Sequence, residues 1–152
     1  TCCDYSQLVR YNHQLSVPRQ LMSRCPACFL NFRTFLCDFT CNPKQNEFMT
    51  ITQEQDYNNN TQEVVSVNYY VTNSSVNQMY NSCVDVQYSA SNQKIMDLLC
   101  GTTVDNCSPY TFVNYLGNNP ETPFIFNVNL TEESFDYNST VKITPINSTM
   151  YS

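Results

Sequence analysis

The stretch that decides the fold runs from residue 2 to residue 41 and reads Cys2-Cys3, then Cys25-Pro26-Ala27-Cys28, then Cys37 and Cys41. Six of the chain's nine cysteines lie in this stretch. Adjacent cysteines point in different directions, so Cys2 and Cys3 need different partners and fasten one segment to two neighbours. This pattern is typical of a protein that folds in an oxidising compartment.

The length and composition indicate an ordered protein that contains one domain. The chain has 152 residues, enough to bury a core, and no internal repeat or domain boundary divides residues 1–152. Charged residues make up 13% of the chain, while it contains 11 Tyr and 9 Phe, which argues against disorder. The formal net charge of −6 disfavours nucleic acid or an anionic membrane surface as a partner.

The chain has the features expected of a piece of a larger luminal or extracellular protein. An odd number of cysteines suggests pairing outside the chain, and the sequence begins at Thr1 without a Met or a signal peptide. No apolar run approaches the ~18 residues that a membrane span needs. Glycosylation triplets agree with this compartment, although chance alone accounts for most of them in so Asn-rich a chain; they begin at Asn59, Asn73, Asn106, Asn129, Asn138 and Asn147.

The first third of the chain predicts helices. Asp4 is a good N-cap for a helix over residues 4–15, and Pro18 suits the first turn of the next helix. The stretch Leu21–Phe39 is apolar on most sides, which predicts a helix that is buried or lines a cavity. Pro26 should break this stretch near Arg24 or Cys25.

The remainder predicts two strands, further helices and one more strand. Strands are expected over residues 48–53 and 63–72, with a loop over 54–62 between them. A helix capped by Asn73 or Ser74 is expected to run to about Val86. Further helices are expected over 92–99 before Gly101, and from Ser108-Pro109 to near Gly117. Residues 124–130 alternate as a strand, and the polar tail over 132–152 gives no clear element. This order predicts an α+β fold with a small mixed sheet.

The sequence contains no recognisable catalytic constellation. Because glycine occurs only at 101 and 117, there is no P-loop, dinucleotide-binding fingerprint or nucleophile elbow. The single histidine, His13, lies between Asn12 and Gln14 on a predicted helix surface, and nothing marks a nucleophile and an orienting acid to work with it. We therefore expect no enzymatic activity and no cofactor.

The cysteines leave two chemical alternatives to structural disulfides. Cys25, Cys28, Cys37 and Cys41 could form a four-thiolate zinc site, although the gap between the pairs is short and the segment is predicted to be helical. The Cys25–Cys28 spacing also occurs in thiol-disulfide oxidoreductases, but a helix rather than a strand precedes it here. Disulfides to distant partners are favoured, and no metal is expected.

Longer motifs carry a family resemblance. One block includes Cys2-Cys3-Asp4, Gln7-Leu8, Ser23-Arg24-Cys25-Pro26-Ala27-Cys28-Phe29 and Thr40-Cys41; a second includes Tyr69-Tyr70-Val71, Met79-Tyr80-Asn81-Ser82-Cys83, Leu98-Leu99-Cys100-Gly101 and Pro123-Phe124. Together they resemble the N-terminal luminal domain of the Niemann–Pick type C sterol transporter family, truncated at both ends. The resemblance extends from Cys2 to about Leu130, and the combined pattern is specific although no single motif is.

The resemblance implies disulfide-stapled helices around a small mixed β-sheet, with an internal lipid pocket. Carried over by position, it implies three disulfides: Cys3–Cys41, Cys28–Cys83 and Cys100–Cys107. It also implies that Cys2, Cys25 and Cys37 pair with cysteines outside this chain, which would explain the odd count.

The resemblance further implies a ligand site for cholesterol. Gln7 matches the family's hydroxyl-binding glutamine, and a further set matches wall or mouth positions: Tyr11, Pro18, Phe29, Asn31, Leu36, Met79, Tyr80, Leu98, Leu99, Pro123 and Phe124. The family's second polar group for the hydroxyl lies before the Cys-Cys pair and is absent here. Tyr11 and Leu36 also depart from the residue types of the family, so the cavity can differ in shape.

The function implied is non-enzymatic binding and hand-off of a sterol on the luminal side of late endosomes or lysosomes. The expected partners are cholesterol or a related sterol and a soluble luminal carrier protein. Contact with a membrane is expected only through other parts of the parent chain. The alternative is a disulfide-rich extracellular binding domain of the folate or riboflavin receptor kind, without sterol activity, although such flat ligands favour stacking groups and Trp is absent.

Overall fold

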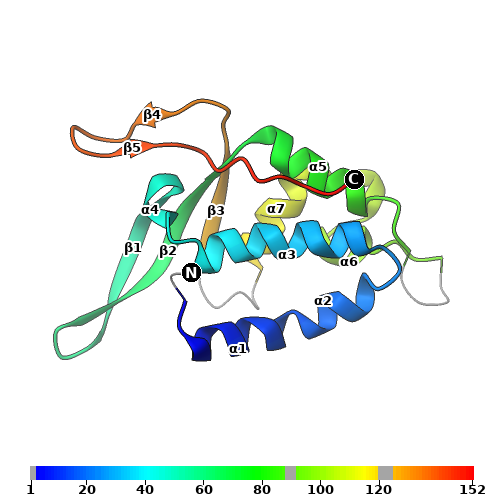
Figure 1. Ribbon diagram of the computed structural model, residues 1–152, viewed down its shortest axis with the longest axis horizontal. Helices are drawn as coiled ribbons and strands as arrows, with labels where there is room; N and C mark the ends of the chain where they lie inside the picture. The colour runs from blue at the N-terminus through cyan, green and yellow to red at the C-terminus, as the bar shows by residue number, and fades with distance from the viewer. Residues whose placement is uncertain (1–2, 88–91, 120–124) are drawn as a thin grey trace.

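The computed structural model describes residues 3–87, 92–119 and 125–152, which form helices packed against a small mixed sheet (Figure 1). The helices and strands of these residues are α1 Tyr5–Gln14, α2 Ser16–Leu21, α3 Pro26–Cys41, α4 Gln45–Phe48, β1 Met49–Asn58, β2 Thr61–Val71, α5 Asn73–Cys83, α6 Met96–Leu99, the 3₁₀ helix η1 Val104–Asn106, α7 Pro109–Asn118, β3 Ile125–Leu130, β4 Phe135–Asp136 and β5 Lys142–Ile143. This composition confirms the predicted α+β class.

Local sequence signals determine where the first three helices begin. Asp4 caps α1 as predicted, because its carboxylate accepts a hydrogen bond from the backbone N–H of Gln7. Pro18 lies in the first turn of α2, and Pro26 is the first residue of α3, where its missing N–H leaves no hydrogen bond unmade. The expected break in the apolar stretch therefore lies between α2 and α3.

The sheet has the strand order β1-β2-β3. β1 and β2 form an antiparallel hairpin, while β3 pairs in parallel with β2 after a connection through α5, α6 and α7. The predicted loop over 54–62 is wrong, because most of these residues continue the two strands to a tight turn. Asn60 adopts a left-handed conformation with φ of 71° in this turn, which asparagine tolerates better than most residues.

The core is an aromatic cluster between α3 and the sheet. Tyr69 on β2 is completely buried, and its ring lies 5.2 Å from that of Phe35 and 5.3 Å from that of Phe39 on α3. Its hydroxyl donates to the backbone oxygen of Phe35 at 3.2 Å, so the buried polar group has a partner. Burial raises the pKa of Tyr69 well above its ordinary value.

The C-terminal tail is more ordered than the sequence predicts. β4 and β5 form a short hairpin, and residues 144–152, which we call the strap, then run past α5 and α3 (Figure 1). The strap is held by backbone bonds from Ile146 N to Tyr70 O at 3.0 Å and from Thr72 N to Ile146 O at 3.1 Å. Farther on, Ser148 donates through Oγ to Asp38 Oδ2 at 2.6 Å.

Three disulfides join these elements in the pairing that the resemblance implies. Cys3–Cys41 links the start of α1 to the end of α3, Cys28–Cys83 links α3 to α5, and Cys100–Cys107 closes the loop between α6 and α7. Because Cys28 and Cys41 have these partners, the structure supports neither the four-thiolate zinc site nor a Cys25–Cys28 redox pair. Among the described residues, no helix has both the length and the apolar character needed to cross a membrane.

Candidate functional site

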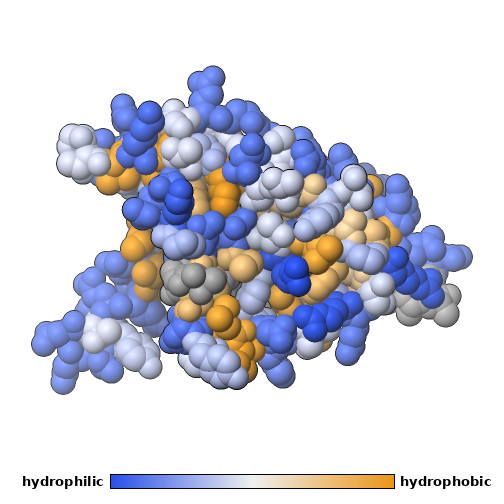
Figure 2. All heavy atoms as spheres, in the orientation of Figure 1, coloured by the Kyte–Doolittle hydropathy of each residue, from blue (hydrophilic) through white to orange (hydrophobic). Residues whose placement is uncertain are grey.

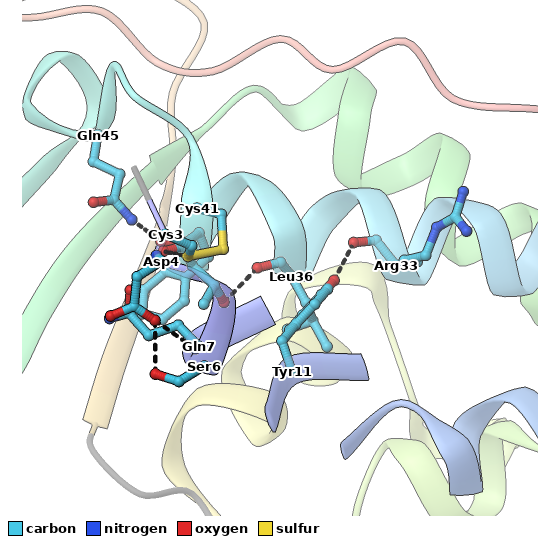
Figure 3. The surroundings of a disulfide bond; sticks show 11 residues. Cys3, Asp4, Ser6, Gln7, Tyr11, Arg33, Leu36, Cys41 and Gln45 are labelled. Carbon is cyan, nitrogen blue, oxygen red and sulfur yellow. Dashed lines mark hydrogen bonds between the residues drawn. A yellow bond between two sulfur atoms is a disulfide. The ribbon is translucent and has the colours of Figure 1, made fainter. Parts of the chain in front are cut away.

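Gln7 is fixed in place by the start of α1. Its side-chain Oε1 accepts a hydrogen bond from Asp4 N at 2.9 Å, which completes a reciprocal capping box with the Asp4 carboxylate. The Cys3–Cys41 disulfide fastens the residue before this box to the end of α3 (Figure 3). Gln7 is exposed, and no described residue accepts a hydrogen bond from its Nε2, so this donor is available to solvent or to a ligand.

Gln7 contributes to the wall of a pocket of about 690 Å³. The pocket lies between the start of α1, the end of α3, the beginning of the β1–β2 hairpin and the β4–β5 hairpin, and Figure 2 shows apolar side chains in the hollow between the two hairpins. Its other lining residues are Phe39, Thr40, Gln45, Asn46, Met49, Thr50, Ile51, Val64, Val67, Tyr137 and Val141. The wall is therefore mostly apolar, with a few amide and hydroxyl groups, as in many small-molecule sites.

The electrostatics of the capping box favour an ionised Asp4. The backbone N–H of Gln7 and then the hydroxyl of Ser6 hold the pKa of Asp4 below its ordinary value of 3.8. Asp4 accepts from Ser6 Oγ at 2.7 Å and from Gln7 N at 2.8 Å. At neutral pH the charged carboxylate keeps the first turn of α1, and with it Gln7, in position.

A second group of predicted residues lies where α1 and α2 meet α3. Tyr11 donates through its hydroxyl to Arg33 O at 2.8 Å, and burial raises its pKa above the ordinary value. Leu36 and Phe29 on α3 and Pro18 on α2 are half-buried. Neither α1 nor α2 contains a fully buried residue, although α1 carries apolar side chains on one face. The residues that flank α2, Leu15 and Met22, are buried instead and belong to the core.

A third group lies on α5 and α6. Met79 is completely buried, and Tyr80 donates through its hydroxyl to Cys107 O at 3.3 Å. Leu99 is half-buried against the core, whereas Leu98 is 42% exposed. The predicted mouth residues Pro123 and Phe124 lie outside the described residues.

Asn31 is completely buried, and protein atoms bind both ends of its amide. Nδ2 donates to Ser82 Oγ at 2.9 Å and to Tyr151 O at 2.7 Å, while Oδ1 accepts from Tyr151 N at 2.6 Å. The amide therefore holds the strap against α3 and α5.

The structure brings Gln7 together with residues that the sequence did not single out. Of the predicted ligand residues, Gln7 alone belongs to the described wall of this pocket. The core, or the half-buried residues packed against it, includes Tyr11, Phe29, Leu36, Met79, Tyr80 and Leu99. The sequence did not indicate Thr50 as a pocket residue. Thr50 is 8% exposed, and its Oγ1 has no hydrogen-bond partner among the described residues. The alternation in β1 could have indicated that Met49 and Thr50 face different sides, but only the fold shows that both reach the pocket.

The chain was compared with known proteins. Residues 1–152 match the family described as Niemann-Pick C1 N terminus. The pig protein "NPC intracellular cholesterol transporter 1" is 38% identical over 130 residues, which cover 81% of this chain and 10% of that protein. The human "NPC1-like intracellular cholesterol transporter 1" is 30% identical over 118 residues, covering 76% of this chain and 9% of that protein. The fruit-fly "NPC intracellular cholesterol transporter 1 homolog 1b" is 28% identical over 137 residues, covering 88% and 11%.

The chain thus spans about a tenth of the length of the relatives it matches. The match covers every residue of the chain and includes the cysteines that form the three disulfides. Members of the matched family are domains of transporters rather than of enzymes. The chain belongs to the family of Niemann–Pick C1 N-terminal domains.

Proposed function

We propose that this chain binds a sterol without covalent chemistry and passes it onward, as the luminal sterol-binding part of a cholesterol transporter. The family and the printed names of its relatives support a sterol ligand. The observation that carries the proposal is the setting of Gln7, whose amide is fixed at the wall of a mostly apolar pocket with its Nε2 donor not engaged by the described residues.

The chemistry of a sterol suits such a setting. A sterol is an apolar body with one hydroxyl, and burial of its body is favourable by about 25 cal/mol per Å². The hydroxyl must find a hydrogen bond, because an unpaired buried polar group costs about 1–3 kcal/mol. Gln7 Nε2 can donate to the sterol oxygen while Oε1 remains bonded to Asp4 N. A single fixed amide then sets which end of the sterol enters first.

The other predicted wall and mouth residues supply the remainder of the site in this proposal. Tyr11, Phe29 and Leu36, which are half-buried against the core, contact the sterol body beneath α1 and α2. Toward the mouth, the proposed contacts are Pro18, Met79, Tyr80, Leu98, Leu99, Pro123 and Phe124. Asn31 contributes by holding the strap in place and does not bond to the sterol, because its amide is already bonded to Tyr151 and Ser82.

The exposed side chain of Leu98 supports the proposal that the ligand enters and leaves near α6. We place there the transient contact with a soluble luminal carrier, which delivers the sterol through the mouth near α6. The proposed location of the chain is the luminal side of late endosomes and lysosomes, where the parent protein anchors it to the membrane.

Competition between cholesterol and its 3-methyl ether tests the proposal on the chain as it is. The ether oxygen can still accept from Gln7 Nε2, but its methyl group needs extra room, so in an enclosed site the ether should compete about tenfold more weakly, a difference of about 1.4 kcal/mol. Equal competition would show that the hydroxyl end is not enclosed. Failure of labelled cholesterol to bind at all would reject the sterol proposal.

A further inference from the structure

The six glycosylation triplets differ in what the fold does with their asparagine side chains. An N-glycan is attached through Nδ2, which retains one of its two hydrogens, while Oδ1 stays available as an acceptor. In a suitable asparagine, Nδ2 is therefore exposed and donates to no protein atom. Its Oδ1 can still accept hydrogen bonds that stabilise the fold. These requirements separate the triplets on physical grounds.

Asn138, in the loop between β4 and β5, meets both requirements. Its Oδ1 accepts hydrogen bonds from Thr140 N at 2.9 Å, Thr140 Oγ1 at 3.0 Å and Val141 N at 2.8 Å. No described residue accepts a hydrogen bond from its Nδ2, and the residue is exposed in the loop that joins β4 to β5. These side-chain bonds join atoms of residues 138–141 only, so they can form in the chain before the domain folds.

Two other triplets use the donor that a glycan would need. Asn129 is half-buried on β3 and donates through Nδ2 to Asn127 O at 3.0 Å. Asn106 donates through Nδ2 to Thr103 Oγ1 at 2.9 Å, and the middle residue of its triplet, Cys107, is in a disulfide. A sugar on either Nδ2 would replace or crowd a contact that the folded chain makes.

We propose that Asn138 is a site of N-glycosylation in this protein and that Asn129 and Asn106 are not. The donor is a lipid-pyrophosphate-linked oligosaccharide of the secretory pathway. Nδ2 attacks the anomeric carbon of the first sugar, the new C–N bond forms as the C–O bond to the pyrophosphate breaks, and Nδ2 loses one proton. This inference rests on the luminal location given under the proposed function.

The position of the glycan has a consequence for the pocket. Tyr137 and Val141, which flank the triplet, line the pocket beside Ile51 and Val64 of the β1–β2 hairpin. These four side chains are all exposed apolar groups. A glycan on Asn138 stands at this rim and shields it from other proteins, which leaves the region of α6 as the side open to a carrier.

Site mapping on the chain secreted from cultured animal cells tests the proposal. Enzymatic release of N-glycans converts each occupied Asn to Asp, and mass spectrometry of the peptides identifies those positions. Conversion is expected at Asn138, with none at Asn129 or Asn106. Thr140→Ala, which keeps the backbone N–H donors of the turn, should remove one glycan from the secreted chain, while the matched Thr140→Ser should keep it.

An unmodified Asn138, or an occupied Asn129 or Asn106, would overturn the proposal. Cholesterol binding by the same secreted sample separates this result from the proposed function. A chain that binds cholesterol but has no glycan at Asn138 contradicts the glycosylation site alone. A chain with a glycan at Asn138 that binds no cholesterol contradicts the sterol function alone.

Discussion

The side-chain amide of Asn31 pairs with the backbone of Tyr151 as a neighbouring strand would. Tyr151 N donates to Asn31 Oδ1 at 2.6 Å, and Asn31 Nδ2 donates back to Tyr151 O at 2.7 Å. The two residues are 120 positions apart, and one of them is completely buried on α3. This clamp fixes the end of the strap over the helices that the Cys28–Cys83 disulfide joins.

Replacement of Asn31 by Ala should therefore weaken the fold strongly. The change leaves the N–H and C=O of Tyr151 without their partner and removes a buried amide, so we expect a loss of about 2–3 kcal/mol in the free energy of unfolding. Denaturant unfolding of the oxidised chain measures it, with Asn77→Ala on the exposed face of α5 as a control near zero. Removal of residues 151–152 should cost a similar amount and should not add to Asn31→Ala.

The stability that each disulfide contributes should increase with the length of chain that it closes. Cys28 and Cys83 are 55 positions apart, whereas Cys100 and Cys107 are 7 apart. In the chain-entropy view, loss of the first costs about 4 kcal/mol and loss of the second about 2.5 kcal/mol. Paired Cys→Ala variants of each bond, compared by thermal unfolding, test this order. A larger loss for the Cys100–Cys107 pair would contradict it.

Gly117 should not tolerate a side chain. A Cβ on this residue of α7 would lie 1.9 Å from the backbone oxygen of Phe126 on β3, and strand backbone cannot move as a flexible side chain can. Gly117→Ala should therefore separate α7 from β3 and destabilise the chain by about 2 kcal/mol or more. The exposed Asn114→Ala on the same helix serves as the control, and equal stability of the two variants would show that α7 does not pack this closely.

The capping box should make the chain sensitive to acid. Because hydrogen bonds lower the pKa of Asp4 below 3.8, the stabilisation that Asp4 gives is complete above that value and is lost as the pH falls through the lower pKa of the folded state. Asp4→Asn keeps a good N-cap that does not titrate. Between pH 2 and 6, the free energy of unfolding should therefore depend less on pH for the variant than for the wild type. Identical pH dependence would show that the Asp4 carboxylate does not stabilise the capping box.

Local signals in the sequence predicted where several helices begin. However, Thr72 rather than Asn73 or Ser74 caps α5, and the helix expected over 92–99 is only the short α6. Asp4 and Ser108 cap α1 and α7 as expected, and Gly101, with φ of 67°, follows α6. The cysteine pattern also led to the correct disulfides, but only through the family resemblance, since spacing alone leaves many pairings open. These features depend on a few adjacent residues or on a pattern shared by relatives.

The sequence failed where stability comes from contacts without an apolar pattern. Residues 54–62 were predicted as a loop because they are polar, yet backbone pairing extends the hairpin with both faces exposed to solvent. The strap was missed for a similar reason, because Ser148 and Tyr151 are held by Asp38, Ser75 and Asn31, far away in the chain. The pocket wall combines α1, α3 and both hairpins, so periodicity within one element could not reveal it.

Equilibrium binding of labelled cholesterol to the wild type, to Gln7→Ala and to Gln20→Ala tests the central claim most directly. Gln20 is an exposed glutamine of α2 and serves as the matched control. The account predicts that Gln7→Ala binds about tenfold more weakly, since one hydrogen bond to the sterol hydroxyl is lost, and that Gln20→Ala binds like the wild type. Thermal unfolding of each variant separates this loss from any damage to the cap of α1. Equal affinity of Gln7→Ala and wild type in folded samples would contradict the account.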